Sequence, residues 1–253
     1  TAFFAPTGAR VVDLPTHAFQ RRSYWPRPMT NRPGDVTAAG LRDAGHPLLG
    51  AAVALAGDEG HLFTGRLSLR DHAWLADHDV LGTVLFPGTG FLELAVRAAD
   101  EVGCDRVEEL TLATPLPLPR TGGTHLQLQV GRPDDTGRRT VRIHSRPDDA
   151  AADGPWTLHA TGILGTGATA EPVDLTAWPP PGAETLDVST FYDMYRAGGF
   201  TYGPSFQGLR QAWRVGEDVY VEVALPAEHA ADAAAYGLHP PLLDAAVQAL
   251  TFV

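Results

Sequence analysis

Two apolar helical patterns constrain the fold of this chain more than any other feature. In the first, Phe91, Leu94, Ala95 and Ala98 recur at helical spacing, and Gly103 marks an end. The second begins at residues 242–250, with the sequence LLDAAVQAL. Because small and apolar residues cover more than one side of each pattern, both helices must be buried, and a buried helix needs a sheet around it.

Alternating apolar and polar residues predict the strands of such sheets. We expect strands at 61–69, 74–80, 126–130, 141–144, 156–160 and 219–225. Several strands after one central helix predict an α+β arrangement in which a sheet wraps around the helix. The second half of the chain repeats the same parts, with a short helix near 191–195 before its strand and its buried helix.

The sequence divides into four expected segments. Residues 1–42 are expected to form a linker, because five prolines interrupt any continuous helix or central strand there. Residues 43–166 form the first half, the Ala/Gly/Pro-rich stretch 167–187 is a connector, and residues 188–253 form the second half. Because the second half stops soon after its helix starts, we expect it to be truncated here.

Composition excludes several chemistries. All 19 basic residues are arginine, so no Schiff-base lysine and no phosphate-binding loop of the G-x-x-x-x-G-K-[ST] type is possible. The single cysteine, Cys104, excludes an intrachain disulfide and a cysteine-rich zinc site.

Charge and hydropathy narrow the partners and the location. The net charge of -11 and the pI near 5.2 disfavour nucleic acid. No apolar run reaches the roughly 18 residues that a membrane span requires. Residues 1–30 lack the basic-then-apolar pattern of a signal peptide. We therefore expect a cytoplasmic segment of a larger protein, without a nucleic-acid or membrane partner.

His78 is the first candidate for chemistry. The pattern His78-x3-Gly82-x4-Pro87 places an imidazole at a strand end, before a glycine-rich entry into the first buried helix. A helix start offers unpaired N–H groups and a positive dipole end to a carbonyl oxygen. The alternative interpretation is a buried histidine with a structural hydrogen bond.

Asp244 is the second candidate, because an unpaired carboxylate inside an apolar helix is costly. Gln248 lies four residues further on and shares its face, so its amide can hydrogen-bond the carboxyl. Burial is expected to raise the pKa of Asp244 and to leave the carboxyl able to donate a proton. The alternative, an aspartate on the helix surface, conflicts with its apolar neighbours.

The third candidate is a turn that presents Tyr202. Glycines 199 and 203 and Pro204 constrain the backbone on both sides of this residue. Its hydroxyl could hydrogen-bond a substrate or a catalytic group, whereas the alternative is an aromatic residue that merely fills the turn.

Taken together, these patterns resemble the signature motifs of dehydratase domains in modular type I polyketide synthases. The motifs, in family order, are His78-x3-Gly82-x4-Pro87, Gly199-Phe-x-Tyr202-Gly203-Pro204-x-Phe206 and Asp244-x3-Gln248. His46-Pro-Leu-Leu-Gly50 resembles the start of the family's domain, and residues 14–25 are similar to the segment that follows its acyltransferase domain. Two positions are variants: Phe200 stands where the family more often has Tyr, and Gln248 alternates with His in the family.

The resemblance implies a double hotdog fold, two tandem sheets each wrapped around a helix, and the loss of water from a β-hydroxyacyl thioester. By family analogy, His78 removes the α-proton and Asp244 protonates the leaving hydroxyl. Tyr202 and Gln248 orient that end of the substrate. The Pro87 carbonyl holds the His78 ring, and backbone near Gly82 binds the thioester oxygen.

The same resemblance implies the partners. The substrate is presented on the phosphopantetheine of an acyl carrier protein, and no cofactor or metal is needed. Acyltransferase and ketoreductase domains adjoin the dehydratase in the same chain, and the domain forms a homodimer. Carrier proteins are acidic, so arginines are expected at the docking surface, with five unranked candidates: Arg66, Arg70, Arg97, Arg210 and Arg214.

Several alternatives remain open. Asp71, His72, Asp77, His78 and Asp79 could belong to a metal-dependent hydrolase. A serine hydrolase is less favoured, because Ser205 lies outside a G-x-S-x-G motif, and a dinucleotide site is discounted, because the Gly88-x-Gly90 pair lacks the rest of the fingerprint. A dehydratase-like domain could also be catalytically silent and serve architecture or dimer contacts. Relatives that isomerise a double bond or close a pyran ring share the fold.

Overall fold

The computed structural model describes residues 36–167 and 175–253, which belong to one unit that begins at Asp35. It contains three α-helices and twelve strands among these residues. The helices are α1 (Gly88–Glu101), α2 (Phe191–Ala197) and α3 (Pro240–Gln248). The strands are β1 (Ala51–Ala54), β2 (His61–Leu67), β3 (His78–Val80), β4 (Thr83–Val84), β5 (Arg106–Leu112), β6 (Thr124–Val130), β7 (Arg139–Pro147), β8 (Thr157–Gly165), β9 (Glu184–Leu186), β10 (Phe200–Tyr202), β11 (Leu209–Val215) and β12 (Asp218–Val223).

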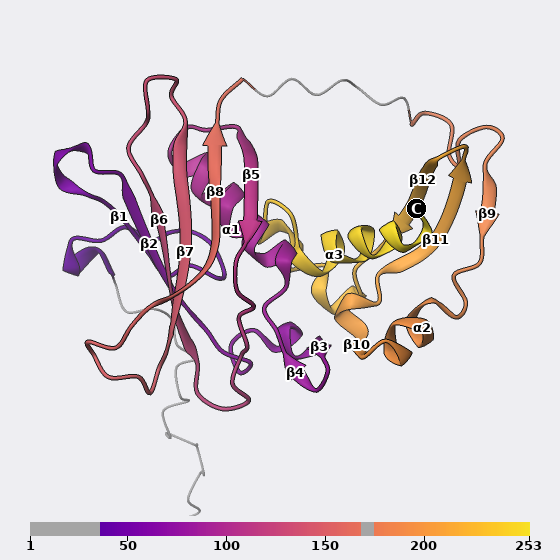
Figure 1. Cartoon of the computed structure of the whole chain (residues 1–253), viewed down its shortest axis with the longest axis horizontal. Coiled ribbons are helices and arrows are strands. Elements are labelled where there is room, and N and C mark those ends of the chain that lie inside the picture. The colour runs from indigo at the N-terminus through magenta and orange to yellow at the C-terminus, as the bar shows by residue number, and fades with distance from the viewer. Residues whose placement is uncertain (1–35, 168–174) are drawn as a thin grey trace, which may run out of the picture. The chain divides into compact units, whose positions relative to one another are not determined.

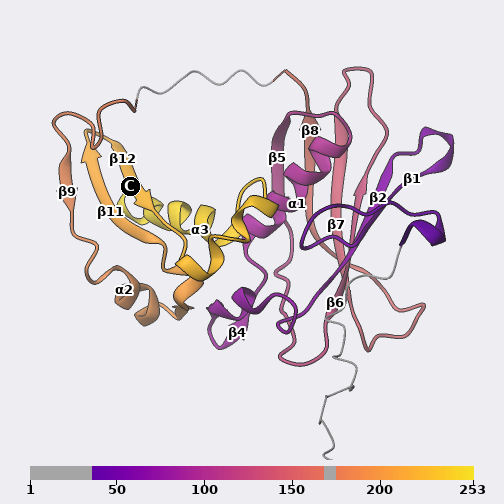
Figure 2. The same cartoon turned by 180° about the vertical axis from the view of Figure 1, so that it is seen from behind.

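The first half is an antiparallel sheet of six strands that packs on α1 (Figures 1 and 2). Its strand order is β1-β2-β6-β7-β8-β5. Along β6, Leu126, Leu128 and Val130 are buried while the intervening glutamines are more exposed, as the alternation predicts. The core between sheet and helix contains Phe63, Leu94 and many other apolar side chains. The prediction of a sheet wrapped around a central helix is therefore confirmed.

Helix α1 has recognisable sequence signals at both ends. Its N-cap is Pro87, whose extended backbone does not continue into the helix. At the other end, Gly103 has a φ of 73°, in the left-handed region that glycine adopts without steric cost and that commonly ends a helix. The fully buried residues of α1 include Leu94, Ala95 and Ala98, as its small-residue pattern predicts.

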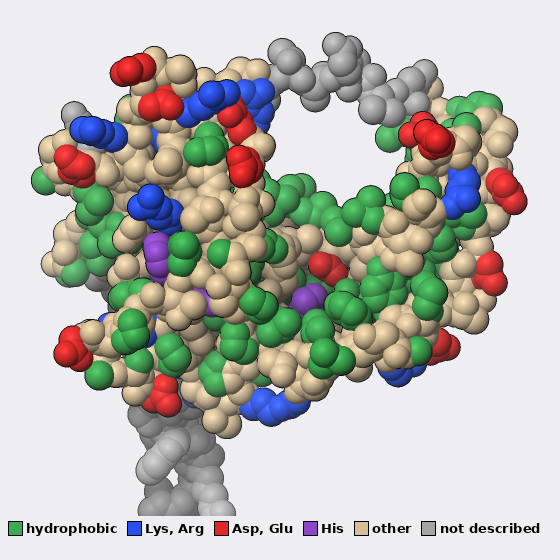
Figure 3. Space-filling model, in the orientation of Figure 1, with side chains coloured by type: hydrophobic (Ala, Val, Ile, Leu, Met, Phe, Trp, Pro, Cys, Tyr) green, Lys and Arg blue, Asp and Glu red, His purple; other side chains and the backbone are tan. Residues whose placement is uncertain are grey.

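The second half repeats this arrangement on a smaller scale. The sheet β12-β11-β9 is antiparallel, and β12 contacts α3. Pro240 and Pro241 occupy the first turn of α3, where a missing N–H costs no helical hydrogen bond. Figure 3 shows hydrophobic side chains gathered over the part of this face where α3 and β11 lie. Two apolar side chains at the end of α3 and just after it, Val247 and Leu250, are 46% and 66% exposed.

A third, small sheet joins the two halves. Its order is β10-β3-β4, so a strand of the second half pairs with a strand of the first. The pairing is antiparallel, with Tyr202 opposite His78 and Phe200 opposite Val80. His78 and Tyr202, which are 124 positions apart in sequence (202 − 78), thus become direct neighbours in one sheet.

Some local predictions were wrong. The strand expected over 74–80 is a 3-10 helix, Ala73–Asp77, followed by β3 from His78. Strands β1, β5 and β11 were not predicted, because their sequences lack a clear alternation of apolar and polar residues. Strand β9 lies inside the expected connector 167–187 and pairs with β11.

The expected linker 1–42 falls mostly on residues that the structure does not describe. The last residue of this segment belongs with the first sheet, because Arg42 exchanges backbone hydrogen bonds with Ala52 in β1. The division of the chain into linker, two halves and connector otherwise stays a prediction. Within residues 36–167 and 175–253, no helix is both long and apolar enough to cross a membrane.

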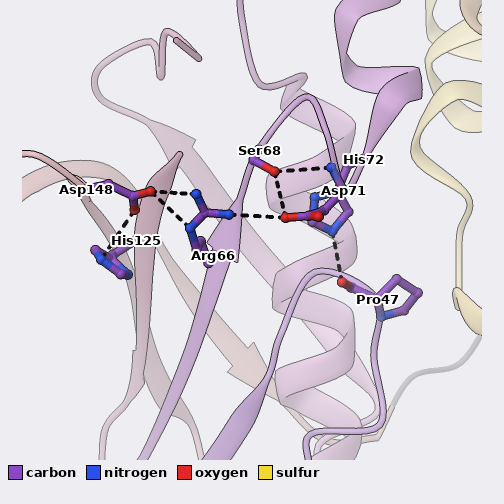
Figure 4. A network of polar contacts seen from close by, with 7 residues as sticks. All are labelled: Pro47, Arg66, Ser68, Asp71, His72, His125 and Asp148. Carbon is purple, nitrogen blue, oxygen red and sulfur yellow. Dashed lines mark hydrogen bonds and ion pairs between the residues drawn. The ribbon is translucent and has the colours of Figure 1, made fainter. Parts of the chain in front are cut away.

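A polar network fixes the loop that leads towards His78 (Figure 4). Arg66 in β2 lies between Asp148 and Asp71, with Nη2 donating to Asp148 Oδ2 at 2.6 Å and Nη1 donating to Asp71 Oδ2 at 3.1 Å. Ser68 Oγ also donates to Asp71, and His72 Nε2 donates to the Pro47 carbonyl. These bonds tie residues 68–72 to the first sheet just before the 3-10 helix that ends at Asp77.

Candidate active site

His78 is held in one tautomer by the backbone. Its Nδ1 lies 2.9 Å from the Leu85 carbonyl oxygen, and the Leu85 amide donates back to the His78 carbonyl at 3.1 Å. A carbonyl can only accept, so Nδ1 carries the ring proton and Nε2 is left with a free lone pair. The ring can therefore act as a base through Nε2 without losing the bond that orients it.

The expectation that the Pro87 carbonyl holds this ring was wrong. The Pro87 carbonyl instead accepts the amides of Gly90 and Phe91, which begin α1. The turn from β4 into the helix brings the carbonyl two residues earlier, that of Leu85, next to the imidazole. Motif spacing could not distinguish these two carbonyls, because both lie in the same short connection.

Aromatic rings surround the His78 imidazole. Its centroid lies 5.0 Å from that of Phe206 and 5.7 Å from that of Tyr202. Phe206 is fully buried and also packs on Trp74. Such a wall excludes water from one side of the ring, and a lower local dielectric strengthens electrostatic interactions at this place.

Asp244 is buried in α3, with 9% of its surface exposed. Gln248 Nε2 donates to Asp244 Oδ2 at 2.9 Å and to the Phe206 carbonyl at 3.2 Å. The predicted pairing of Gln248 with this carboxyl is thus present. Because the Phe206 carbonyl can only accept, the orientation of the Gln248 amide is unambiguous. Asp244 Oδ1 is left without a bond to Gln248.

Burial raises the pKa of Asp244, as expected from its apolar surroundings. The neighbouring His78 ring opposes the rise, as does the hydrogen bond to the carboxyl from Gln248. This coupling places the two sequence candidates, 166 positions apart (244 − 78), within electrostatic reach of each other. The carboxyl is therefore biased towards its protonated form in the presence of an imidazole base.

Tyr202 lies on β10, directly opposite His78 in the ladder. Its hydroxyl stays protonated at any ordinary pH, because burial raises the pKa of the phenol well above its usual value. The nearby Asp244 carboxylate adds to that effect, while the Gln248 side chain opposes it. The structure thus groups four of the candidates, His78, Tyr202, Asp244 and Gln248.

Contrary to expectation, Gly82 does not lie with this group. It lies in the exposed turn between β3 and β4, and its amide donates to Asp79 Oδ1 at 2.8 Å. That amide is therefore engaged and does not face an incoming carbonyl oxygen. The start of α1 is better suited, because no side chain caps it and the amides of Gly88 and Thr89 precede the first helical hydrogen bonds.

A clamp missed by sequence reasoning holds the two halves together beside the site. Asp77 Oδ2 accepts from the Ser205 amide at 2.9 Å and from Ser205 Oγ at 2.6 Å, and the Gly203 amide donates to the Asp77 carbonyl. His229 Nε2 lies 2.9 Å from Ser205 Oγ. A signal existed in the Gly203-Pro-Ser205 turn, but nothing in the sequence indicated that its partner is the residue before His78.

This clamp also excludes the serine hydrolase interpretation. The single proton of Ser205 Oγ points to the Asp77 carboxylate, so His229 must donate to the hydroxyl rather than accept from it. A nucleophilic serine needs the opposite arrangement, with an imidazole that takes its proton. Ser205 is therefore a structural residue here.

Gly203→Ala is expected to lower the free energy of unfolding by about 1–3 kcal/mol, because overpacking displaces neighbouring groups. A methyl group at this position would lie 2.2 Å from Asp77 Oδ1 and 2.7 Å from Asp77 Cβ. Urea denaturation measures the loss. The matched control is Gly50→Ala, whose methyl group would meet nothing closer than 3.9 Å. Equal stability of Gly203→Ala and wild type would contradict the clamp.

The acidic and histidine side chains at 71–79 do not converge as a metal-dependent hydrolase would require. Asp71 binds Arg66, and His72 binds the Pro47 carbonyl. Asp77 binds Ser205, and Asp79 binds the amide of Gly82. Among the described residues, no group of three or more histidine, cysteine or acidic side chains is arranged to hold a metal ion.

Two family models match the chain. Residues 46–146 match the polyketide synthase dehydratase domain, and residues 170–253 match the polyketide synthase dehydratase N-terminal domain. The pikromycin polyketide synthase component PikAII of Streptomyces venezuelae is 58% identical over 251 residues. These residues cover 98% of the chain but 7% of that protein, so the chain spans a small part of the relative's length.

Solved structures agree with these matches. The dehydratase domain from the terminal module of the rifamycin polyketide synthase is 45% identical, with a TM-score of 0.80, over 85% of this chain and 78% of that one. The erythromycin dehydratase is also 45% identical, with a TM-score of 0.79, over 86% of this chain and 79% of that one. Together with the helix-and-sheet unit in each half, these matches confirm the predicted double hotdog fold.

Proposed function

Because the chain belongs to the dehydratase domains of modular type I polyketide synthases, we propose that His78 and Asp244 act as base and acid in its reaction. The reaction converts a β-hydroxyacyl thioester into the α,β-unsaturated thioester with loss of water, as expected of a hydro-lyase of this family. The observation that supports the assignment is that His78, paired with Tyr202 across β3 and β10, lies within electrostatic reach of the buried Asp244.

His78 Nε2 takes the α-proton of the substrate. A thioester α-proton is weakly acidic, so its removal needs a neutral imidazole with a fixed lone pair and a polarised carbonyl beside it. The bond from Nδ1 to the Leu85 carbonyl supports this role, because it leaves Nε2 unprotonated. The same bond stabilises the imidazolium that forms, since the Nδ1 donor becomes stronger when the ring is charged.

Asp244 protonates the departing β-hydroxyl, because hydroxide by itself is a poor leaving group. Its proton is assigned to Oδ1, since Oδ2 accepts from Gln248. The C–O bond breaks as the electrons of the broken C–H bond form the double bond, and the hydroxyl leaves as water with the Asp244 proton. The imidazolium of His78 then returns a proton to the carboxylate, which restores both groups.

Tyr202 and Gln248 orient the hydroxyl end of the substrate in this proposal. Gln248 Oε1 is buried without a hydrogen-bond partner, which suits it to accept from the substrate hydroxyl. The thioester oxygen lies at the start of α1, near the amides of Gly88 and Thr89, where the helix dipole stabilises developing negative charge. This position replaces the earlier expectation at Gly82.

The surroundings of the reaction stay proposals as well. We propose that an acyl carrier protein presents the substrate on its phosphopantetheine, and that acyltransferase and ketoreductase domains adjoin the domain in one multidomain protein. Multidomain relatives support this context. A homodimer, a cytoplasmic location and a reaction without cofactor are further parts of the proposal. The arginine docking candidates keep no ranking.

Mass spectrometry of a carrier-bound 3-hydroxyacyl chain tests the function directly. Incubation with the whole protein is expected to remove one water from the acyl chain, because both proton-transfer groups are in place. A substrate that keeps its mass would contradict the proposal and favour a catalytically silent domain. A product with the mass of the enoyl thioester but a shifted double bond or a new ring, separated from it by chromatography, would point instead to the isomerase and pyran-forming relatives.

A further inference from the structure

Glu93 is a buried acid in α1 that the proposed mechanism does not use. Only 1% of its surface is exposed, and three N–H groups surround its carboxylate. Oε1 lies 2.9 Å from His46 Nε2 and accepts from the Gly237 amide at 2.8 Å, and Oε2 accepts from the Leu238 amide at 2.6 Å. One carboxylate thus joins the start of the first half to a turn of the second half.

A second hydrogen bond orients the partner imidazole. The Leu48 amide donates to His46 Nδ1 at 3.2 Å, so Nδ1 is an acceptor and Nε2 carries the only ring proton. His46 therefore donates to Glu93 through Nε2. The Glu93 carboxylate is a buried anion held by three N–H donors, and such charge-assisted bonds are stronger than bonds between neutral groups.

The balance of effects on Glu93 favours its ionised form. Burial alone would raise the pKa of the carboxyl. The hydrogen bonds from His46 and from the amides of Leu238 and Gly237 outweigh that penalty, and the pKa lies below its ordinary value. Because removal of a donor or of the charge leaves a buried polar group unsatisfied, this site has a strongly preferred geometry.

The hydrogen bonds of Glu93 join α1 to the turn before α3, and each of these two elements is next to one of the proposed catalytic groups. On one side, the chain before α1 carries Leu85, whose carbonyl and amide both bond His78. On the other side, Gly237 and Leu238 lie directly before α3, which begins at Pro240 and contains Asp244. Helix α1 is rigid between these points, with a rise of about 1.5 Å per residue.

We propose that Glu93 is a positioning residue, which sets the distance between Asp244 and His78 by fastening the turn before α3 to α1. This proposal rests on the proposed function, because it assigns a role in the same reaction. Glu93 touches neither substrate nor reacting atoms. It acts through the Gly237 and Leu238 amides on α3, and a misplacement of about 1 Å at a catalytic group can reduce a rate about a hundredfold.

Two variants separate positioning from stability. In Glu93→Gln, the new NH2 group meets an N–H donor in either orientation of the amide. An NH2 group at the Oε1 position would meet the donors of His46 and Gly237, whereas at the Oε2 position it would meet only the Leu238 amide. His46→Ala removes one donor and leaves both amide bonds to the carboxylate. Both variants are expected to lose stability. Only Glu93→Gln is expected to lower kcat, by about ten- to a hundredfold, with KM within about threefold of wild type.

The pH profile supplies a readout that lost stability alone would not change. The pKa of Asp244 is raised by burial, so activity that needs the protonated acid is lost as the pH rises through that pKa. If α3 moves and Asp244 gains solvent, its pKa falls, and the alkaline limb of kcat/KM shifts to lower pH. We expect this shift in Glu93→Gln and none in His46→Ala.

The variants are made in the whole protein and compared with a wild type whose dehydration has been established first. If the wild type removes no water, the proposed function fails. Hydrogen exchange then still tests whether Glu93 fastens the turn before α3 to α1, since Glu93→Gln and not His46→Ala should speed amide exchange across 237–248. If Glu93→Gln does not fold, Glu93→Asp keeps the charge but is one methylene too short and should show the same shift. Equal kcat in the Glu93 variants and wild type, or losses that follow stability equally in both substitutions, would overturn the proposal.

Discussion

Replacing His78 with Phe is expected to reduce kcat for water loss by about a thousandfold or more, since a positioned general base contributes roughly 10²–10⁴ in rate. Phe has no lone pair at the position of Nε2, so nothing in this place can take the α-proton. The substitution preserves an aromatic ring that packs on Phe206 and Tyr202, and the fold should survive. Carrier-bound 3-hydroxyacyl substrate, followed by mass spectrometry over time, measures the rate.

A matched control uses another histidine on the same approach to the site. His72 lies six residues before His78, and its imidazole bonds the Pro47 carbonyl and none of the proposed catalytic groups. His72→Phe removes this imidazole. Its kcat should stay within about threefold of wild type. Near-normal turnover of the folded His78→Phe variant would show that another group removes the α-proton, and the assignment of the base would have to be abandoned.

Replacing Asp244 with Asn is expected to reduce kcat by about a hundred- to ten-thousandfold, because the amide cannot protonate the leaving hydroxyl. The shape of the side chain and its place beside Gln248 are kept, so binding of substrate should change little. The expected signature is therefore a loss in kcat and kcat/KM with a nearly unchanged KM. The same mass-spectrometric assay provides these values.

Although Asp244→Asn lowers kcat, it is not expected to lower the free energy of unfolding, and the reason lies in the raised pKa of Asp244. A carboxyl with a raised folded-state pKa contributes fully while protonated and loses that contribution as the pH rises through the folded pKa. Asn does not ionise, so at neutral pH the variant should be as stable as wild type or more stable. Denaturation at several pH values measures this difference.

The surface acid Asp193, paired with Arg196 on α2, offers the matched control. Asp193→Asn should leave both kcat and the pH dependence of stability unchanged, since the pair is largely exposed. A folded Asp244→Asn variant that turns over at the wild-type rate would refute the role of Asp244 as acid. A variant that loses activity together with its fold would be recognised from the denaturation curves.

The secondary structure around the site was predictable where periodicity is strong. Helix α1 and strands β2, β6, β7 and β8 appear where spacing placed them, because each buries one regular face. Strands β3 and β4 contain three and two residues, too few to show a period. The 3-10 helix before β3 was mistaken for a strand, since Trp74 and Leu75 form an apolar run without a distinguishing pattern.

Side chains that interact within one element were predictable, and those that interact across the fold were not. Gln248 reaches Asp244 because residues four apart share a helix face. The bonds of His78 to Leu85, of Asp77 to Ser205 and of Glu93 to Leu238 depend on where separate elements meet. Which carbonyl accepts from His78 Nδ1, that of Leu85 or that of Pro87, also depends on where these elements meet.

The sequence by itself determined the residue types, the buried helix α1 with its strands, an apolar second helix that the structure leaves exposed on one side, and a carboxyl that burial makes a proton donor. These properties follow from local spacing and from the cost of burying a charge, which need no knowledge of distant contacts. Only the tertiary structure decided that Tyr202 pairs with His78, that Leu85 sets the imidazole tautomer, and that Glu93 joins α1 to the turn before α3. Such contacts arise when the two halves pack, and sequence separation carries no information about them.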